Sequence, residues 1–86
     1  MVFHKVKSVK PLSDMRLCVE FDNFVIKTCD IKPLMDEWEI LNDLKTPGLF
    51  QLVHVDANGY GIAWNDYLDL SCNELWDRGV IVRESP

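Results

Sequence analysis

The sequence predicts an α+β fold: a small, mainly antiparallel sheet of five or six strands, made from two hairpins, with two short helices packed on one face. Two observations predict the hairpins. Stretches that alternate apolar and polar residues flank the turn-forming pairs Asp22-Asn23 and Asn58-Gly59. A third observation predicts the helices, because residues 31–41 and 72–78 carry apolar stripes and capping signals typical of helices.

The first three strands are expected to form a meander. Residues 2–12 alternate β-branched residues with lysine and serine, and Pro11 favours an edge position because it cannot donate a ladder hydrogen bond. Ser13-Asp14-Met15 then turns the chain into the first hairpin. With Asp22-Asn23 as a two-residue loop, the pairs that share one face are Phe21 with Phe24, Val19 with Ile26, and Leu17 with Thr28, which brings five apolar side chains together.

A short helix is expected within residues 31–41, with Asp30 as its N-cap and Pro33 in its first turn. One apolar stripe at helical spacing supports this, and it consists of Ile31, Leu34, Met35, Trp38 and Leu41. We interpret that stripe as core packing.

The second hairpin has the stronger turn signal, Asn58-Gly59, after a strand at residues 50–57. A two-residue loop pairs Val55 with Ile62. One face then carries apolar residues, namely Val53, Val55, Ala57, Tyr60, Ile62 and Trp64. The other face carries His54, Asp56, Gly61 and Ala63, and its two small residues leave room for something to pack there.

A brief strand is expected at residues 68–70, followed by a capping box in which the Ser71 hydroxyl and the Glu74 carboxylate satisfy backbone N–H groups. Leu70 and Leu75 fit a hydrophobic staple, and Gly79 fits the end of the helix. Residues 80–86 are expected to form an edge strand or a tail. The predicted core comprises Leu17, Val19, Phe21, Phe24, Ile26, Leu34, Trp38, Val53, Val55, Ile62, Trp64, Leu70 and Leu75.

The 86 residues predict one domain spanning 1–86, with a net charge of −5. Residues 1–16 hold four of the nine basic residues and one acid, so the remaining chain is strongly acidic. That charge disfavours nucleic-acid binding, because contacts to phosphates dominate such affinity. With no apolar run of membrane-spanning length and no signal-peptide pattern, we expect a cytoplasmic protein with no membrane contact and reduced cysteines.

No cluster of residues predicts catalysis, a cofactor or a metal site. His4 and His54 lie fifty residues apart, and His54 with Asp56 provides only two ligands on one strand face. The three cysteines, Cys18, Cys29 and Cys72, have no adjacent histidine to activate them, and the four glycines are too scattered for a phosphate loop.

The order of features resembles a small bacterial domain-of-unknown-function family of about 80 residues. The resemblance extends over almost the whole chain, and rests on Val9-Lys10-Pro11-Leu12, Asp14, Leu17, Val19, Phe21, Asp30, Pro33-Leu34, Phe50, Val53, Val55-Asp56, Ile62, Trp64, Asp69-Leu70 and Leu75. This chain departs from the family at Asp22-Asn23, where Asp-Gly or a similar pair is usual. The resemblance implies an α+β fold and the second place in a toxin–antitoxin-like gene pair, but no catalytic residues.

These observations favour a non-enzymatic protein-interaction module, antitoxin-like, that binds an operon-encoded neighbour or another copy of itself through an edge strand. The candidate partner-binding residues are His54, Tyr60, Gly61, Ala63, Tyr67 and Trp76. One alternative is a small ligand binder or enzyme with a site around Asp56, Trp64 and Asp69. A second alternative is a DNA-binding regulator or adaptor that uses the basic N-terminal strand.

Overall fold

The computed structural model describes residues 4–83 as two antiparallel sheets and a few short helices. The four-stranded sheet has the order β1-β2-β3-β7 and is made of β1 (Val6–Leu12), β2 (Arg16–Phe21), β3 (Ile26–Asp30) and β7 (Val80–Arg83). The three-stranded sheet has the order β4-β5-β6 and is made of β4 (His54–Asp56), β5 (Gly61–Ala63) and β6 (Asp69–Ser71). The predicted α+β class is confirmed, but the prediction of one sheet with five or six strands is wrong.

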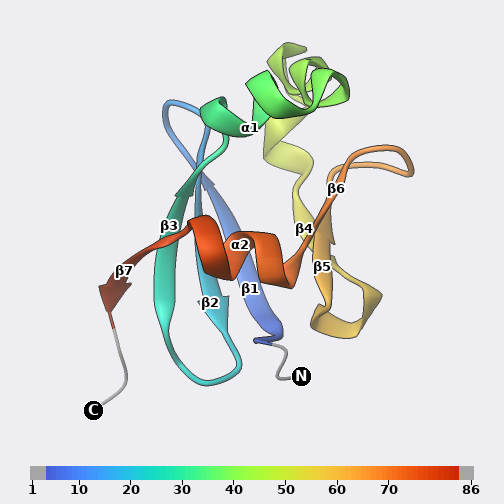
Figure 1. Cartoon of the computed structure of the whole chain (residues 1–86). Helices are drawn as coiled ribbons and strands as arrows, with labels where there is room; N and C mark the ends of the chain where they lie inside the picture. The colour runs from blue at the N-terminus through green and yellow to red at the C-terminus, as the bar shows by residue number, and fades with distance from the viewer. Residues whose placement is uncertain (1–3, 84–86) are drawn as a thin grey trace.

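The two α-helices occupy different places (Figure 1). Helix α2 (Cys72–Arg78) lies across one face of the four-stranded sheet, whereas α1 (Lys32–Glu37) follows the end of β3. Trp38 has extended backbone angles, with φ −125° and ψ 105°, and ends α1. The chain continues as the 3-10 helices η1 (Glu39–Lys45), η2 (Phe50–Leu52) and η3 (Ala57–Gly59). The predicted helix over 31–41 is therefore divided at Trp38, and the predicted strand over 50–57 is reduced to β4.

The first hairpin pairs one residue away from the predicted register. Val19 lies opposite Lys27 rather than Ile26. The loop has three residues rather than two, because the Phe21 N–H donates to the Val25 carbonyl and Phe24 takes a positive φ of 70°. A three-residue loop that ends in a left-handed residue is a common hairpin connection. The predicted meander of β1, β2 and β3 is confirmed.

This register exchanges the faces of β3. Phe24 is exposed and Ile26 is half-buried, so their predicted core positions are wrong. The positions that face α2 instead are Val25, Lys27 and Cys29. Lys27 is only 7% exposed, and its ammonium donates to the Trp76 carbonyl at 2.6 Å.

The second hairpin has the predicted register, with Val55 opposite Ile62. Asn58 and Gly59 have φ values of 57° and 95°, as a type I′ turn requires. A Cβ on Gly59 would lie 2.8 Å from the Val6 carbonyl oxygen, so glycine also permits the turn to approach β1.

Helix α2 begins and ends where the sequence predicts. The Glu74 N–H donates to the Ser71 hydroxyl at 3.2 Å, and both staple residues, Leu70 and Leu75, are buried. The Glu74 carboxylate does not complete the capping box; it accepts a hydrogen bond from Arg78. Gly79 ends the helix with extended backbone angles, and a Cβ there would lie 2.9 Å from the Cβ of Lys27.

The core lies between the four-stranded sheet, α2 and the β4–β6 sheet. Eight predicted core residues are buried: Leu17, Val19, Phe21, Leu34, Ile62, Trp64, Leu70 and Leu75. Val53 and Val55 are half-buried and pack against this core, so their predictions are confirmed in part, whereas Trp38 is exposed and its prediction is wrong. The core gains residues from irregular segments as well, including Ile31, Leu41, Leu44, Phe50 and Leu68.

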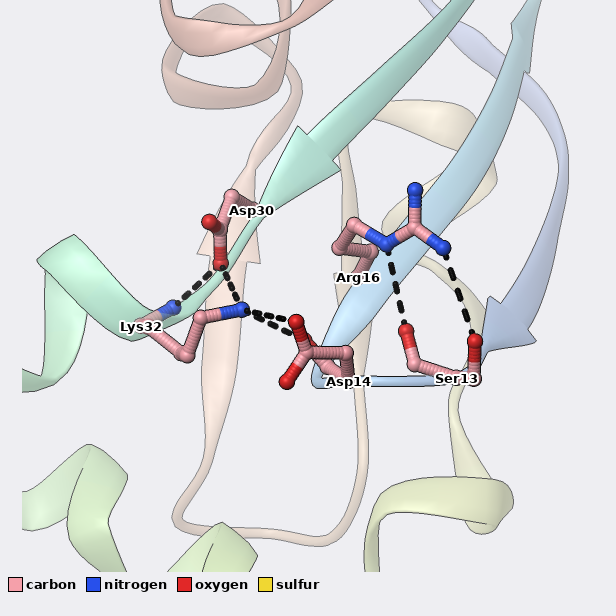
Figure 2. A network of polar contacts seen from close by, with 5 residues as sticks. All are labelled: Ser13, Asp14, Arg16, Asp30 and Lys32. Atoms are coloured by element: carbon pink, nitrogen blue, oxygen red, sulfur yellow. Dashed lines mark hydrogen bonds and ion pairs between the residues drawn. The ribbon is translucent and has the colours of Figure 1, made fainter.

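A surface cluster joins the β1–β2 turn to the start of α1 (Figure 2). The Lys32 ammonium lies 3.0 Å from Asp30 Oδ1 and 3.2 Å from Asp14 Oδ2, and it donates to the Asp14 carbonyl at 2.6 Å. The Asp30 carboxylate also accepts from the Lys32 N–H, but the N-cap of α1 is Ile31, so the prediction of Asp30 as the N-cap is wrong by one residue. These contacts hold a turn in which Asp14 and Met15 both have positive φ.

Candidate functional site

The six predicted partner-binding residues do not form one surface. His54, Tyr60 and Tyr67 are exposed, whereas Gly61 and Ala63 are buried in the central strand of the smaller sheet. A Cβ on Gly61 would lie 2.7 Å from the Leu70 carbonyl oxygen of β6, so close strand approach explains this glycine.

Trp76, the sixth residue, is enclosed by its own chain. The His4 ring stacks on its indole with centroids 3.6 Å apart, and the Lys27 ammonium lies 3.7 Å from the indole centroid. Phe21 meets the ring edge-on at 4.9 Å. Trp76 is half-buried, and these contacts pack α2 against the sheet.

A different surface gathers exposed aromatic side chains. We call it the aromatic groove, a hollow of about 330 Å³ between the segment after α1 and the segment that enters α2. Its lining residues are Trp38, Ile40, Leu41, Tyr67, Leu68, Asp69, Leu70, Ser71 and Glu74. Of the predicted partner-binding residues, Tyr67 alone lines this groove.

The groove combines a buried apolar floor with exposed walls. Leu41, Leu68 and Leu70 are buried and form the floor. Trp38 is 39% exposed, Ile40 53% and Tyr67 80%. Large aromatic side chains held open to solvent around an apolar hollow are typical of interface anchors.

Arg78 fixes one wall of the groove. Its guanidinium makes two contacts with the Glu37 carboxylate, at 2.6 and 2.9 Å, and its Nε donates to Glu74 at 2.7 Å. It also lies 5.8 Å from the centre of the Trp38 ring. Hydrogen bonds from Arg78 to Glu37 and then to Glu74 raise the pKa of Arg78, so this charged link between α1 and α2 persists over the physiological pH range.

The chain around the groove is strongly acidic. Residues 36–77 contain nine of the fourteen acidic residues and only one basic residue, Lys45. Asp69 and Glu74 lie in the groove lining itself, and the Arg78 charge is already paired. Arg78 supplies one positive charge against the three negative charges of Glu37, Glu74 and Asp69, so these four residues at and beside the groove have a net charge of −2, which favours a positively charged partner.

The three residues of the alternative ligand site do not converge. Asp56 and Asp69 line a small hollow of about 220 Å³, whereas Trp64 is buried and its indole donates to the Phe50 carbonyl at 3.1 Å. Within residues 4–83, no three His, Cys, Asp or Glu side chains are grouped as a metal site would require.

The three cysteines are free thiols; Cys18 and Cys29 lie on opposite faces of the four-stranded sheet, and Cys72 is the first residue of α2. Cys29 is buried under α2, and desolvation raises its pKa to about 11, against the smaller opposing effect of Arg78. Burial also raises the pKa of Cys72. A raised pKa leaves little thiolate, so neither thiol is activated for nucleophilic chemistry.

The basic N-terminal strand is partly engaged within the chain. The Lys5 ammonium lies 4.7 Å from the Tyr60 ring centre, and Lys7 lies 5.2 Å from that of Phe24 and 3.7 Å from the Glu20 carboxylate. These contacts pair part of the positive charge that the DNA-binding alternative would require.

No protein family matches the chain, and neither a curated protein nor a solved structure shows significant similarity to it. In the part of the chain that the structure describes, every helix is too short or too polar to cross a membrane.

The groove could not be predicted from the sequence, because its walls come from separate segments of the chain. Trp38 and Ile40 are near in sequence, but Tyr67 lies beyond both strands of the second hairpin. The break at Trp38 turns its side chain away from the core, and the stripe pattern contained no signal for that break. The concentration of acidic residues over 36–77 was the one signal that could have drawn attention to this surface.

Proposed function

We propose that this chain is a non-enzymatic protein-interaction module whose aromatic groove takes an apolar anchor flanked by basic residues from a partner protein. The exposure of Trp38, Ile40 and Tyr67 around one apolar hollow supports the proposal most directly. A leucine or an aromatic side chain would be buried against the groove floor, and lysine or arginine beside it would face the acidic surroundings.

The family resemblance supports a particular kind of partner. It favours the product of a neighbouring gene in a two-gene operon, with this chain as the antitoxin-like member. A basic neighbour would match the charge of residues 36–77, and mutual attraction would speed its association with this chain at low salt.

Co-expression with the neighbouring gene product, followed by gel filtration, tests this proposal. We expect one complex for the wild type. The double variant Trp38→Ala, Tyr67→Ala should bind at least about tenfold more weakly, because truncating central aromatic anchors costs more than 1 kcal/mol.

The matched control is Leu52→Ala, since Leu52 is 60% exposed and lies outside the groove lining. It should leave the complex intact. Unchanged binding by the double variant would overturn the assignment of the groove, and separate elution of the two wild-type proteins would overturn the choice of partner.

A further inference from the structure

The outer strand of the larger sheet exposes an uncharged apolar run. Val80, Ile81 and Val82 are 67%, 50% and 61% exposed, and β7 is the last strand in the order β1-β2-β3-β7. Edge strands are normally protected by charges, proline or a covering element. Within the described residues, no proline or covering element protects Val80–Val82, and the one charged residue of β7, Arg83, stands at its end, so the backbone of this run is open to another strand (Figure 1).

The opposite edge of the sheet is protected. Lys7 and Lys10 lie on β1, and Pro11 lacks the N–H that a pairing strand would need. Strands β4 and β5 also contact β1, and the turn at Gly59 lies against the Val6 carbonyl. Pairing of β7 with β1 of another copy is therefore obstructed, which prevents an open-ended chain of copies.

Pairing of β7 with β7 satisfies these constraints. Two copies of one edge related by a two-fold axis form a closed, self-complementary interface. The run contributes only apolar side chains, so no like charges are opposed within it. The acidic β4–β6 region lies on the far side of the sheet from β7, so the acidic regions of the two copies stay apart (Figure 1).

From these features, we infer that the protein forms a two-fold dimer in which β7 of each copy pairs antiparallel, giving one continuous eight-stranded sheet. One strand pair buries less than the area typical of a stable interface, so the dissociation constant should be on the order of micromolar. The two aromatic grooves lie away from β7 and would remain open.

Sedimentation equilibrium over a concentration series tests the dimer. We expect the wild-type mass to rise with concentration from 10.0 kDa towards twice that value. The double variant Val80→Lys, Val82→Lys should weaken association at least about tenfold, because it places like charges opposite one another across the two-fold axis. The control Leu52→Lys changes a similarly exposed residue outside β7 and should dimerise like the wild type.

Isotope-filtered nuclear Overhauser spectra of a mixture of labelled and unlabelled wild-type protein locate the interface without any substitution. We expect intermolecular contacts between β7 backbone protons of the two copies. A monomer at all concentrations up to about a hundredfold above the expected micromolar constant would overturn the inference. So would a dimer whose intermolecular contacts lie outside β7, or one that the two lysines leave unchanged.

Discussion

The indole rings of Trp76 and Trp38 have different surroundings in the fold. Trp76 has His4 stacked at 3.6 Å, Lys27 at 3.7 Å and Phe21 at its edge, so its contacts are made within the fold. Trp38 has only Arg78 nearby at 5.8 Å among the ring contacts of the described residues, and it borders the aromatic groove. The first ring stabilises the fold, and the second is available to a partner.

The difference follows from which elements can reach each ring. Trp76 sits on α2, which lies across the sheet (Figure 1), and Phe21 of β2 and Lys27 of β3 contact its ring. Trp38 sits at the break between α1 and η1, where its backbone is extended, and its side chain is 39% exposed although Leu41 and Leu44 of η1 return to the core. The following predictions test this division between a ring used for folding and a ring used for binding, together with the packing of the elements that surround each ring.

The largest expected effect is on Trp76. Trp76→Ala should lower the free energy of unfolding by about 3 kcal/mol, because it removes the packing of three neighbouring side chains. Trp38→Ala should lower it by less than about 1 kcal/mol, since much of that ring is already solvated. Denaturant unfolding of both variants measures the two values, and equal losses would contradict the division.

Thiol reactivity should differ between Cys29, on the sheet face under α2, and Cys18, on the opposite face. The Cys29 pKa of about 11, against an ordinary 9.0, leaves about 100-fold less thiolate at neutral pH. Iodoacetamide labelling followed by peptide mass spectrometry should therefore modify Cys18 well before Cys29.

The raised pKa of Cys29 also makes the stability of the folded protein depend on pH. Because folding raises the pKa of Cys29, its contribution to stability is complete below pH 9 and is lost as the pH rises towards about 11. Faster labelling of Cys29 than of Cys18 in the folded protein would contradict its placement beneath α2.

Lys27 should matter more than an exposed lysine that also lies over a ring. Lys27→Met keeps most of the stem that packs on Gly79 but removes the contact with the Trp76 ring and the 2.6 Å hydrogen bond. We expect a loss of about 1–2 kcal/mol in unfolding free energy. The control Lys7→Met should change it by less than about 0.5 kcal/mol, because Lys7 is exposed. Equal changes would show that Lys27 is not enclosed with Trp76.

The smallest expected effect concerns the surface cluster of Figure 2, which supports α1 ahead of Trp38. Desolvation opposes a lower pKa of Asp30, but hydrogen bonds from the Lys32 backbone and ammonium outweigh it and lower the pKa below 3.8. The stabilisation is present above that value and lost as the pH falls through the lowered pKa. Asp30→Asn should reduce this acid-dependent loss in thermal melts, whereas Asp22→Asn should leave it unchanged. Identical acid profiles for the wild type and Asp30→Asn would contradict the effect.

The two hairpins show how far local sequence determined the fold. Asn58-Gly59 accepts positive φ at both positions, so the turn itself determined the register of β4 and β5. For Asp22-Asn23, the alternation of apolar and polar residues predicted a two-residue loop, and this prediction is wrong because the loop has three residues. In the register that forms, the strand packs Val25, Lys27 and Cys29 under α2. The local sequence pattern contains no information about this tertiary contact.

The candidate site was less predictable than the fold. The capping signals at Ser71 and Gly79 determined α2, because they depend on neighbouring residues alone. Trp38 was predicted in the core and Trp76 on a partner surface, but Trp38 is 39% exposed and Trp76 is half-buried, because the exposure of both depends on distant segments. The groove needs both the break after α1 and the position of Tyr67, so residue spacing could not reveal it.

The most direct test follows the indole N–H signals of Trp38 and Trp76 by NMR during a peptide titration. The probe is Lys-Lys-Leu-Leu-Lys-Lys, and its control is Glu-Glu-Leu-Leu-Glu-Glu. The lysine peptide should shift the Trp38 signal saturably, more weakly as salt rises, and leave Trp76 in place, whereas the glutamate peptide should shift neither. A Trp38 signal unmoved by the lysine peptide, or shifted equally by both peptides, would contradict an acidic, aromatic groove that binds basic partners.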